Sequence, residues 1–525
     1  MQAQTFQLQQ DYSEASAGSD RPHRTHTASR LAWYLWLLML ITLPVTSFPP
    51  IAESLGGIVL VSPLAMLPMF LLILVGVIPS LVRGGRISGF AKPMLFFAVS
   101  ALVSALVAFL LPIVPYKGQT ILDRELRAGI TIVIGLGFYL SALMMPRTRE
   151  QMVASLRAIY VGLFLLTLWS AVQAYTIFDG QGIIPHWIST FHRWFSVRDP
   201  FPDRLTGLAY EPSWFGDQLV LLFLPLLVSS VVSGISVARK FRNWLSIEHL
   251  LLASSLALLV MTKSRISLLS LSAMLGILAL VAGFRILHNW MKRLFSASRG
   301  IGRVRSMLAS GISLVLLLVI CGILAFGLLW GMTKLDPRLS GLFQVGARVT
   351  ELRYFYPQDV IYALGGQLTL AERFIYWTTA FRIFGTYPIL GVGPGNAGFL
   401  FESFMPVYGF QLIEIQNVLN QPIYGFPNPK SLWLRILAEQ GIIGIIAFVS
   451  WLLLLGLSAW ALLKSRDRVD RFIGTAGMLW LVAQLFEGFS LDTYALPQLW
   501  IVPGLLSAWA TRRLFLSGLR AGKPG

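Results

Sequence analysis

Residues Phe426–Gly444 read FPNPKSLWLRILAEQGIIG, and they mark the point at which a long polar segment runs into an apolar one. Three charged side chains lie at this junction, those of Lys430, Arg435 and Glu439. Because charge at the edge of a membrane is energetically costly, a structural or functional reason for them is expected. The apolar run that follows predicts a membrane-spanning helix, so this stretch decides the class of fold.

The start of that helix is predicted from the same stretch. Asn428 is of a residue type that caps helices, and Pro429 suits the first helical position. Polar side chains then recur every three or four residues, a spacing that places them on one helical face. These side chains belong to Asn428, Ser431, Arg435 and Glu439.

The composition of the whole chain is typical of an integral membrane protein. Of its 525 residues, 55% are hydrophobic and 13% are charged. Hydropathy predicts an all-α, polytopic membrane protein with about twelve transmembrane helices and its largest outer loop between spans nine and ten. The predicted spans are 31–48, 58–82, 90–111, 128–145, 152–178, 214–237, 247–262, 266–284, 308–332, 431–463, 472–490 and 493–511. The seventh is short enough to be half of a re-entrant hairpin with the eighth.

The distribution of charge predicts the orientation of these spans. With the N-terminus in the cytoplasm, that side carries 26 of the 42 Lys and Arg residues and 7 of the 24 Asp and Glu residues. This excess follows the positive-inside rule and places both termini in the cytoplasm. The net charge of +18 is therefore interpreted as a topology signal and as contact with anionic lipids of the bilayer, not as nucleic-acid binding.

Two other features are interpreted as structural. Residues 1–30 are polar and predict a disordered cytoplasmic tail, not a cleavable signal peptide. The single cysteine, Cys321, lies in an apolar segment, where packing is its expected role.

Two outer loops, 179–213 and 333–430, are long enough for function to be expected in them. The second has apolar residues at heptad-like spacing, which predicts an amphipathic helix that lies on the membrane surface or caps the bundle. The repeating residues are Leu370, Phe374, Trp377, Phe381 and Phe384, and Arg373 and Arg382 project from the same segment. The stretch YPILGVGPGN (Tyr387–Asn396) matches neither a phosphate loop nor a dinucleotide fingerprint. We interpret it as a tight turn whose glycines let the backbone approach another segment closely.

Charged side chains at the outer helix ends are the candidates for chemistry. Lys263 and Arg265 form a turn between two apolar segments, which is either a plain polar turn or a cationic site for an anionic lipid headgroup. Arg373 is either a surface charge on an amphipathic helix or part of a cationic site for an anionic headgroup. Arg382 is interpreted as a surface charge. Glu211 begins the sixth span, where it serves as a helix cap, a general base or a sugar-hydroxyl ligand.

The alternatives for Lys430 and Glu439 are a helix-end ion-pair cluster and a role in chemistry. No metal site is predicted, because His186 and His192 are the only outer histidines and no acid pair has metal-ligand spacing. No Ser-His-Asp or Cys-His arrangement is apparent, and no cofactor is predicted.

Four segments also carry a resemblance to a known family. RLTGLAYEPSWFG (204–216) looks like the R-x-x-G and E-P-S-x-x-G stretch of many polysaccharide polymerases, and TKSRISLLSL (262–271) looks like an S-R helix start. ERFIYWTTAFRIFGTYPILGVGPGN (372–396) looks like a loop helix with arginines and the glycine-rich turn after it. KSLWLRILAEQGIIG (430–444) looks like the motif H-[N/S/Q]-x9-G-x-x-G, with Lys430 in the place of the histidine typical of ligases. Together they resemble the O-antigen polymerase and O-antigen ligase superfamily of bacterial membrane glycosyltransferases.

This resemblance implies glycosyl transfer from an undecaprenyl-diphosphate-linked oligosaccharide to an acceptor glycan, without a metal, at the outer face of the bacterial cytoplasmic membrane. The catalytic candidates are Lys430, Glu211 and Glu439. The candidate ligands of the substrate diphosphate are Arg265, Arg373 and Lys263. Further candidates for substrate binding are Arg204, Arg435 and Asn396.

The resemblance also divides the chain and orders the possible activities. The parts are a tail (1–30), N-terminal helices with an outer loop (31–203), a polymerase- or ligase-like core (204–450) and C-terminal helices with a basic tail (451–525). Because Lys430 replaces the ligase histidine, a polymerase of O-antigen or exopolysaccharide is favoured over a ligase that transfers polymer to lipid A-core. A chain-length regulator protein is a further implied partner. A flippase for lipid-linked sugars is the alternative from another class, but no clear internal repeat and no midplane charges support it.

Overall fold

The computed structural model describes residues 24–54, 61–85, 87–178, 183–237, 246–295, 371–421 and 425–521. Within these ranges the chain is helical, and its strand-like contacts are isolated bridges at Ser47–Ser62, Ser47–Ser196 and Tyr116–Gln119. The predicted all-α class is therefore confirmed for the described part of the chain.

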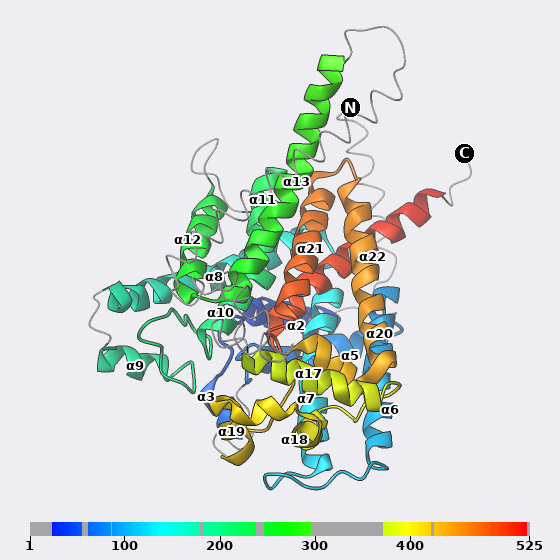
Figure 1. Cartoon of the computed structure of the whole chain (residues 1–525). Helices are drawn as coiled ribbons and strands as arrows, with labels where there is room; N and C mark the ends of the chain where they lie inside the picture. The colour runs from blue at the N-terminus through cyan, green and yellow to red at the C-terminus, as the bar shows by residue number, and fades with distance from the viewer. Residues whose placement is uncertain are drawn as a thin grey trace.

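The long helices pack side by side into a bundle (Figure 1). They are α2 (Arg24–Ile41), α4–η1–α5 (Met66–Val82), α6 (Lys92–Ala108), α7 (Ile121–Met144), α8 (Arg149–Phe178), α10–η3–α11 (Pro212–Ser233), α12 (Ile247–Thr262), α13 (Arg265–Phe295), α20 (Leu432–Leu463), α21 (Arg468–Glu487) and α22 (Ile501–Ala521). Shorter helices are α3 (Pro49–Ser54), α9 (His186–His192), α17 (Ala371–Thr386), α18 (Phe401–Phe404) and α19 (Ile413–Asn420). In Figure 1 the connection between α20 and α21 lies at the upper end, and α9, α17, α18 and α19 gather at the lower end.

Six helical stretches in the described ranges are long and apolar enough to cross a membrane. They are Gly89–Ala108, Ile121–Met144, Arg149–Phe178, Pro212–Ser233, Arg265–Phe284 and Leu432–Leu463. Every predicted span in the described ranges overlaps a helix, and α12 has the predicted bounds. The ninth predicted span (308–332), Cys321 and most of the tail 1–30 lie outside the described residues. A membrane bundle is thus supported, while the count of twelve stays a prediction.

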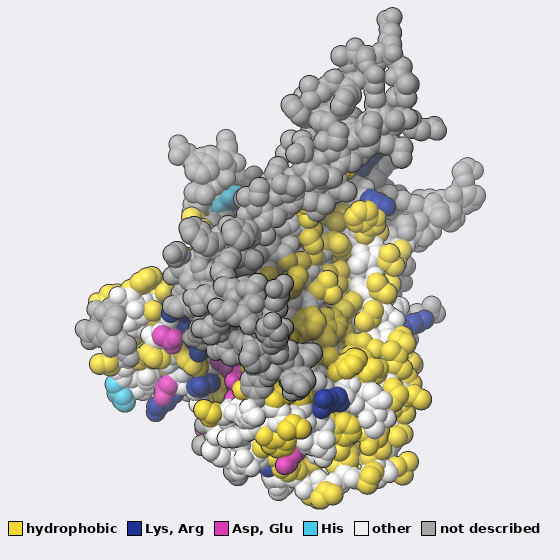
Figure 2. All heavy atoms as spheres, viewed as in Figure 1, with side chains coloured by type: hydrophobic (Ala, Val, Ile, Leu, Met, Phe, Trp, Pro, Cys, Tyr) yellow, Lys and Arg dark blue, Asp and Glu magenta, His cyan; other side chains and the backbone are white. Residues whose placement is uncertain are grey.

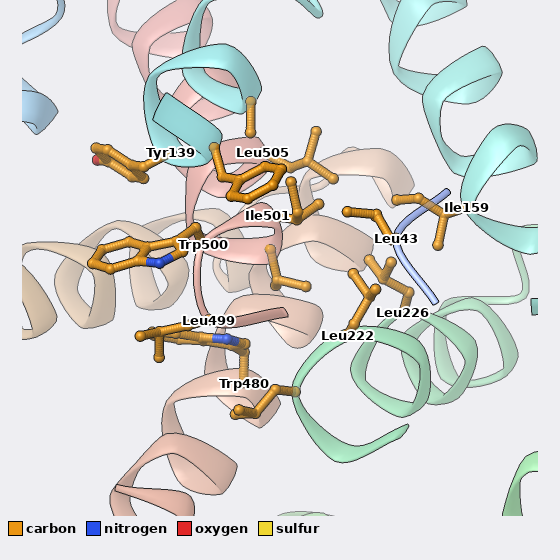
Figure 3. Close-up of a cluster of buried hydrophobic side chains, with 14 of the residues drawn as sticks. Leu43, Tyr139, Ile159, Leu222, Leu226, Trp480, Leu499, Trp500, Ile501 and Leu505 are labelled. Atoms are coloured by element: carbon orange, nitrogen blue, oxygen red, sulfur yellow. The ribbon is translucent and has the colours of Figure 1, made fainter. Parts of the chain in front are cut away.

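The core of the bundle is aromatic and aliphatic (Figure 3). Tyr139 of α7 packs edge-on to Trp451 of α20, with ring centroids 5.5 Å apart. Trp451 also contacts Trp480 of α21 and Trp500 just before α22, at 5.8 and 5.6 Å. Aromatic contacts of this kind add to the burial of apolar area, and here they join four segments that are distant in the sequence.

Apolar side chains are exposed on the outside of the bundle. Figure 2 shows a broad hydrophobic band along one side, while charged side chains gather elsewhere. Leu102 of α6 is 61% exposed, and Leu453 and Leu457 of α20 are 63% and 68% exposed. An exposed apolar surface of this extent is suited to lipid, not to water.

The amphipathic helix predicted from the repeat between Leu370 and Phe384 is present as α17, but a different face is buried. Its buried residues include Ile375, Tyr376 and Ile383. Of the predicted repeat, Phe381 is 59% exposed and the other described aromatic residues are half-buried, while Leu370 lies outside the described residues. Trp377 packs on Phe489, just after α21, with ring centroids 5.5 Å apart. The helix therefore caps the bundle with one face and leaves aromatic side chains on the other.

Helix α20 starts later than predicted. Ser431 is its N-cap, and the Ser431 hydroxyl accepts a hydrogen bond from the backbone of Leu434. The Asn428 side chain instead accepts one from Lys430 N at 2.9 Å, so Asn428 closes the turn before the helix. The prediction of Asn428 as cap and Pro429 as first helical residue is thus wrong by one turn.

Gly441 breaks α20 where the glycine-rich turn crosses it. Its φ and ψ are 63° and −157°, which are not helical values. Backbone hydrogen bonds join the two segments on both sides of the break: Ile442 N donates to Pro388 O at 2.8 Å, and Gly393 N donates to Glu439 O at 3.0 Å. The predicted close approach of the 387–396 backbone is confirmed, and the segment that it approaches is the break in α20.

Replacing Gly441 by Ala is expected to destabilise the protein. A Cβ there would lie 2.3 Å from Ile389 O, and the positive φ adds strain, so a loss of about 1–3 kcal/mol is expected. Thermal unfolding in detergent measures it. Gly456→Ala is the matched control in the same helix, because its nearest neighbour is 3.5 Å away. Equal stabilities of the two variants would contradict the role of the break.

Candidate functional site

The start of α20 is held by two other helices at the lower end of the bundle. Gly488 O, just after α21, accepts hydrogen bonds from Leu432 N at 2.7 Å and from the Ser431 hydroxyl at 3.1 Å. Arg373 of α17 donates to Lys430 O at 2.8 Å. Lys430 itself is half-buried and has a positive φ of 51°. Two predicted site residues, Arg373 and Lys430, are therefore in direct contact.

Arg435 and Glu439 form a buried ion pair one turn further along α20. Arg435 Nε lies 3.0 Å from Glu439 Oε2, and the side chains are 9% and 2% exposed. A second nitrogen of Arg435 donates to Asp492 O, and the guanidinium lies over the Tyr494 ring. The predicted shared face of these residues is confirmed. Because both are enclosed and paired, this geometry fits the structural alternative for Glu439 better than an open acid.

Arg124 and Glu125 at the start of α7 are additional polar residues of this region. Arg124 Nε donates to Gly395 O at 3.2 Å, and its guanidinium lies 4.2 Å from the centroid of the Phe426 ring. Glu125 accepts a hydrogen bond at 2.8 Å from the amide of Asn396, which is fully buried. Asn396 thus fixes the glycine-rich turn to α7.

A second group of predicted residues surrounds the start of α10. Glu211 is the N-cap residue of this helix, as predicted, but its carboxylate makes no capping bond. It accepts a hydrogen bond from the Ser213 hydroxyl at 2.5 Å and lies 4.0 Å from Arg198. Arg204 is 3.8 Å from Asp203 and packs over Phe201. Glu211 is partly exposed, so an acceptor group can reach it.

The loop that carries Glu211 is anchored on α8. The Gln173 amide exchanges two hydrogen bonds of 2.9 Å with the backbone of Gly207. It also faces His192, whose ring is fully buried and stacks on Trp169. Burial lowers the pKa of His192 to about 4, so the ring is neutral at pH 7.

The α12–α13 turn packs against α10. Lys263 is exposed and has a φ of 51°, while Arg265 is half-buried as the first residue of α13. Ser267 lies on the side of α13 that meets α10, since a Cβ on Gly216 would be 2.5 Å from the Ser267 hydroxyl. The start of α13 therefore lies beside α10, the helix that begins directly after Glu211.

A pair of carboxyl groups links the two groups of residues. Asp217 of α10 and Glu487, the last residue of α21, hydrogen-bond to each other and are 1% and 0% exposed. Glu487 also accepts a hydrogen bond from Ser270 of α13 at 2.9 Å. Carboxyl groups that are buried away from water need partners of this kind. Glu487 directly precedes Gly488, which holds the start of α20.

An apolar groove runs along α20 and α21 from this end of the bundle. Its volume is about 730 Å³, and its lining includes Trp433, Leu452, Leu453, Leu457, Leu485 and Phe489. Trp433 is two residues after Ser431. Phe489 follows Gly488 and packs on Trp377, one turn after Arg373 on α17. The groove therefore begins beside the contact between Arg373 and Lys430.

Comparison with known proteins finds one family model, which matches part of the chain. Residues 250–449 match the family model described as O-Antigen ligase. The match confirms the resemblance to the O-antigen ligase and polymerase superfamily. It supports a polysaccharide-related role in a bacterial membrane, with the choice between ligation and polymerisation left open. No curated protein matches the chain.

The carboxyl pair predicts a difference between amide and alanine substitutions. Asp217→Asn keeps a hydrogen-bond donor for Glu487 and is expected to fold with nearly unchanged stability. Asp217→Ala leaves Glu487 without this partner and is expected to cost about 1–3 kcal/mol in thermal unfolding. Asp217→Asn combined with Glu487→Gln is the neutral control pair. An alanine variant as stable as the asparagine variant would contradict the interaction.

The buried His192 predicts a loss of stability in acid. Its pKa of about 4 lies below the ordinary value of 6.5, so the unfolded state binds more protons between these pH values. Stability is therefore expected to fall by about 2 kcal/mol from pH 7 to pH 5 through this residue. Thermal unfolding at both pH values measures the change. His192→Asn keeps an acceptor for Gln173 but does not titrate, so equal slopes for the variant and the wild type would contradict the assignment.

Proposed function

We propose that the protein polymerises undecaprenyl-diphosphate-linked oligosaccharide repeat units into O-antigen or exopolysaccharide. The supporting observation is that the contact between Arg373 and Lys430 lies where the apolar groove of α20 and α21 begins. A lipid diphosphate has both parts of the matching chemistry, an anionic head for the cations and a long apolar chain for the groove. The proposal places this site at the outer face of the cytoplasmic membrane, with both termini in the cytoplasm.

The cations serve the leaving group. In the transfer, a hydroxyl oxygen of the acceptor glycan forms a bond to the anomeric carbon of the donor sugar. The bond from that carbon to the diphosphate breaks, and its electron pair leaves with the lipid diphosphate. Arg373, Arg265 and Lys430 stabilise the negative charge that develops there, and Lys263 adds to the local positive field.

The acceptor proton needs a base, and Glu211 has the more suitable environment. It is partly exposed, whereas Glu439 is enclosed in its ion pair with Arg435. The Ser213 hydroxyl donates a hydrogen bond to the Glu211 carboxylate, and Arg198 lies 4.0 Å from it. We therefore propose Glu211 as the general base, with Arg204 beside it as an acceptor ligand. Arg435, Glu439 and Asn396 then hold the site in shape.

Polymerisation is preferred to ligation because of the residue at position 430. The resembled ligase motif has a histidine at this point, and the chain has Lys430. The E-P-S stretch around Glu211 favours polymerases in the same way. Ligation to lipid A-core or another acceptor is the alternative, and the description of the matched family supports it. A chain-length regulator is proposed as a partner of the polymerase.

Arg373→Gln is expected to lower polymer output by about 100-fold at equal protein level. The substitution removes a positive charge that stabilises the negative charge developing on the diphosphate. Gel analysis of the surface polysaccharide measures it. Arg382→Gln is the matched control on the same helix: Arg382 is exposed, bonds only to Phe404 O in the described structure, and is expected to leave output unchanged. Arg265→Ala tests the second cation. The proposal is wrong if Arg373→Gln and Arg265→Ala both retain normal output.

The products separate the alternatives. Loss of a polymerase leaves single repeats on the surface, whereas loss of a ligase leaves long chains on the carrier lipid. Chain growth by purified protein in detergent, without a sealed membrane, excludes a pure flippase.

A further inference from the structure

A second cavity lies at the opposite end of the bundle from Lys430. Its volume is about 460 Å³, within the range of about 300–1,000 Å³ that is usual for ligand pockets. Its walls come from the middle of α2, from η1 and α5 with the residues just after α5, and from the connection between α7 and α8 with the first turn of α8. Helix α7 starts at Ile121 beside the candidate active site and ends at Met144 beside this cavity, so the two sites are separated by the length of the helix.

The cavity has two arginines, Arg83 and Arg147, and no carboxylate among the described residues that line it. Neutral groups hold Arg147 in place: its Nη2 donates to the Ser80 hydroxyl at 3.2 Å and its Nε to Met144 O at 3.3 Å. Its backbone N donates to the Gln151 side chain at 2.8 Å. The positive charge is therefore oriented without being neutralised by the lining. Both arginines are exposed, and a guanidinium group that is not paired with a carboxylate suits phosphate oxygens.

The rest of the lining is apolar, which restricts the kind of phosphate. Trp33, Val75, Pro79 and Met145 form these walls. On α4–η1–α5 the apolar surface continues to side chains exposed on the outside, including Leu71 at 52% and Leu74 at 61%. A free inorganic anion makes no favourable contact with an apolar surface, whereas the glycerol and acyl chains of a phospholipid cover it. Tryptophan is also common at the level of lipid headgroups.

We propose that this cavity binds the phosphate of an anionic phospholipid, with Arg83 and Arg147 as its ligands. The acyl chains lie along α4, η1 and α5. The bound lipid fills the space between α2, α5 and the α7–α8 connection. It anchors this end of the bundle in the cytoplasmic leaflet of the membrane. The site is separated from the candidate active site by the length of α7.

Native mass spectrometry of the full chain in detergent tests the proposal with added phosphatidylglycerol or phosphatidylcholine. The wild type is expected to retain phosphatidylglycerol at least about tenfold better than phosphatidylcholine. Arg83→Gln combined with Arg147→Gln is expected to lower this retention by about tenfold or more, because two charge-assisted contacts are lost. Arg83→Gln alone is expected to lose part of it. Arg83 is exposed and no side-chain bond of it is described, so this variant tests the site even if replacement of Arg147 impairs folding.

Arg466→Gln is the matched control. Arg466 is an exposed arginine in the α20–α21 connection, and it does not line the cavity. Its replacement is expected to leave lipid retention unchanged. The proposal is overturned if this control and the double variant lose lipid equally, if Arg83→Gln and the double variant both retain it fully, or if both lipids are retained alike. It is also overturned if inorganic phosphate at the same concentration displaces the lipid, because the site then recognises a free anion.

Discussion

A crossing of two backbone segments holds the site end of this protein together. The glycine-rich turn lies directly on the break in α20, so the peptide groups that the break leaves without helical partners bond across the crossing. Inside a membrane such groups have no water to bond with, and each one left without a partner would cost several kcal/mol. Ser104 of α6 supports the crossing from the side, since its hydroxyl lies 2.7 Å from Glu439 O. The position of α17, and with it Arg373, depends on this arrangement because the turn follows that helix directly.

Hydropathy predicted where helices form, and the reason is physical. A segment that crosses a bilayer has to satisfy its own backbone, so a long apolar run is nearly always helical. Side-chain capping was less predictable. Asn428 and Ser431 are both of residue types that cap helices. Ser431 is the N-cap in the structure, where its hydroxyl also donates a hydrogen bond to Gly488 O. The buried face of α17 was also not predicted, because this helix has apolar side chains on both faces.

Some charged residues of the site were not singled out in the sequence, although they could have been. Like Lys430, they are charged residues at or inside a predicted membrane span. Arg124 and Glu125 stand just before a predicted span, and Asp217 and Glu487 stand inside two others. Charge within a span is a functional or structural signal by default. Their partners were not predictable, because Asp217 and Glu487 are 270 residues apart in sequence and only the packing of the α10–η3–α11 helix against α13 and α21 brings them together. The link between the Arg373 and Glu211 groups is therefore a property of the fold.

The positive φ of Lys430 restricts the residue types that this position can hold. A left-handed backbone excludes β-branched residues and favours glycine, asparagine, aspartate and histidine among the alternatives. The backbone here is fixed from outside, by Asn428 at the amide and by Arg373 at the carbonyl. A histidine at this position could therefore adopt the same backbone conformation and keep both of these backbone hydrogen bonds.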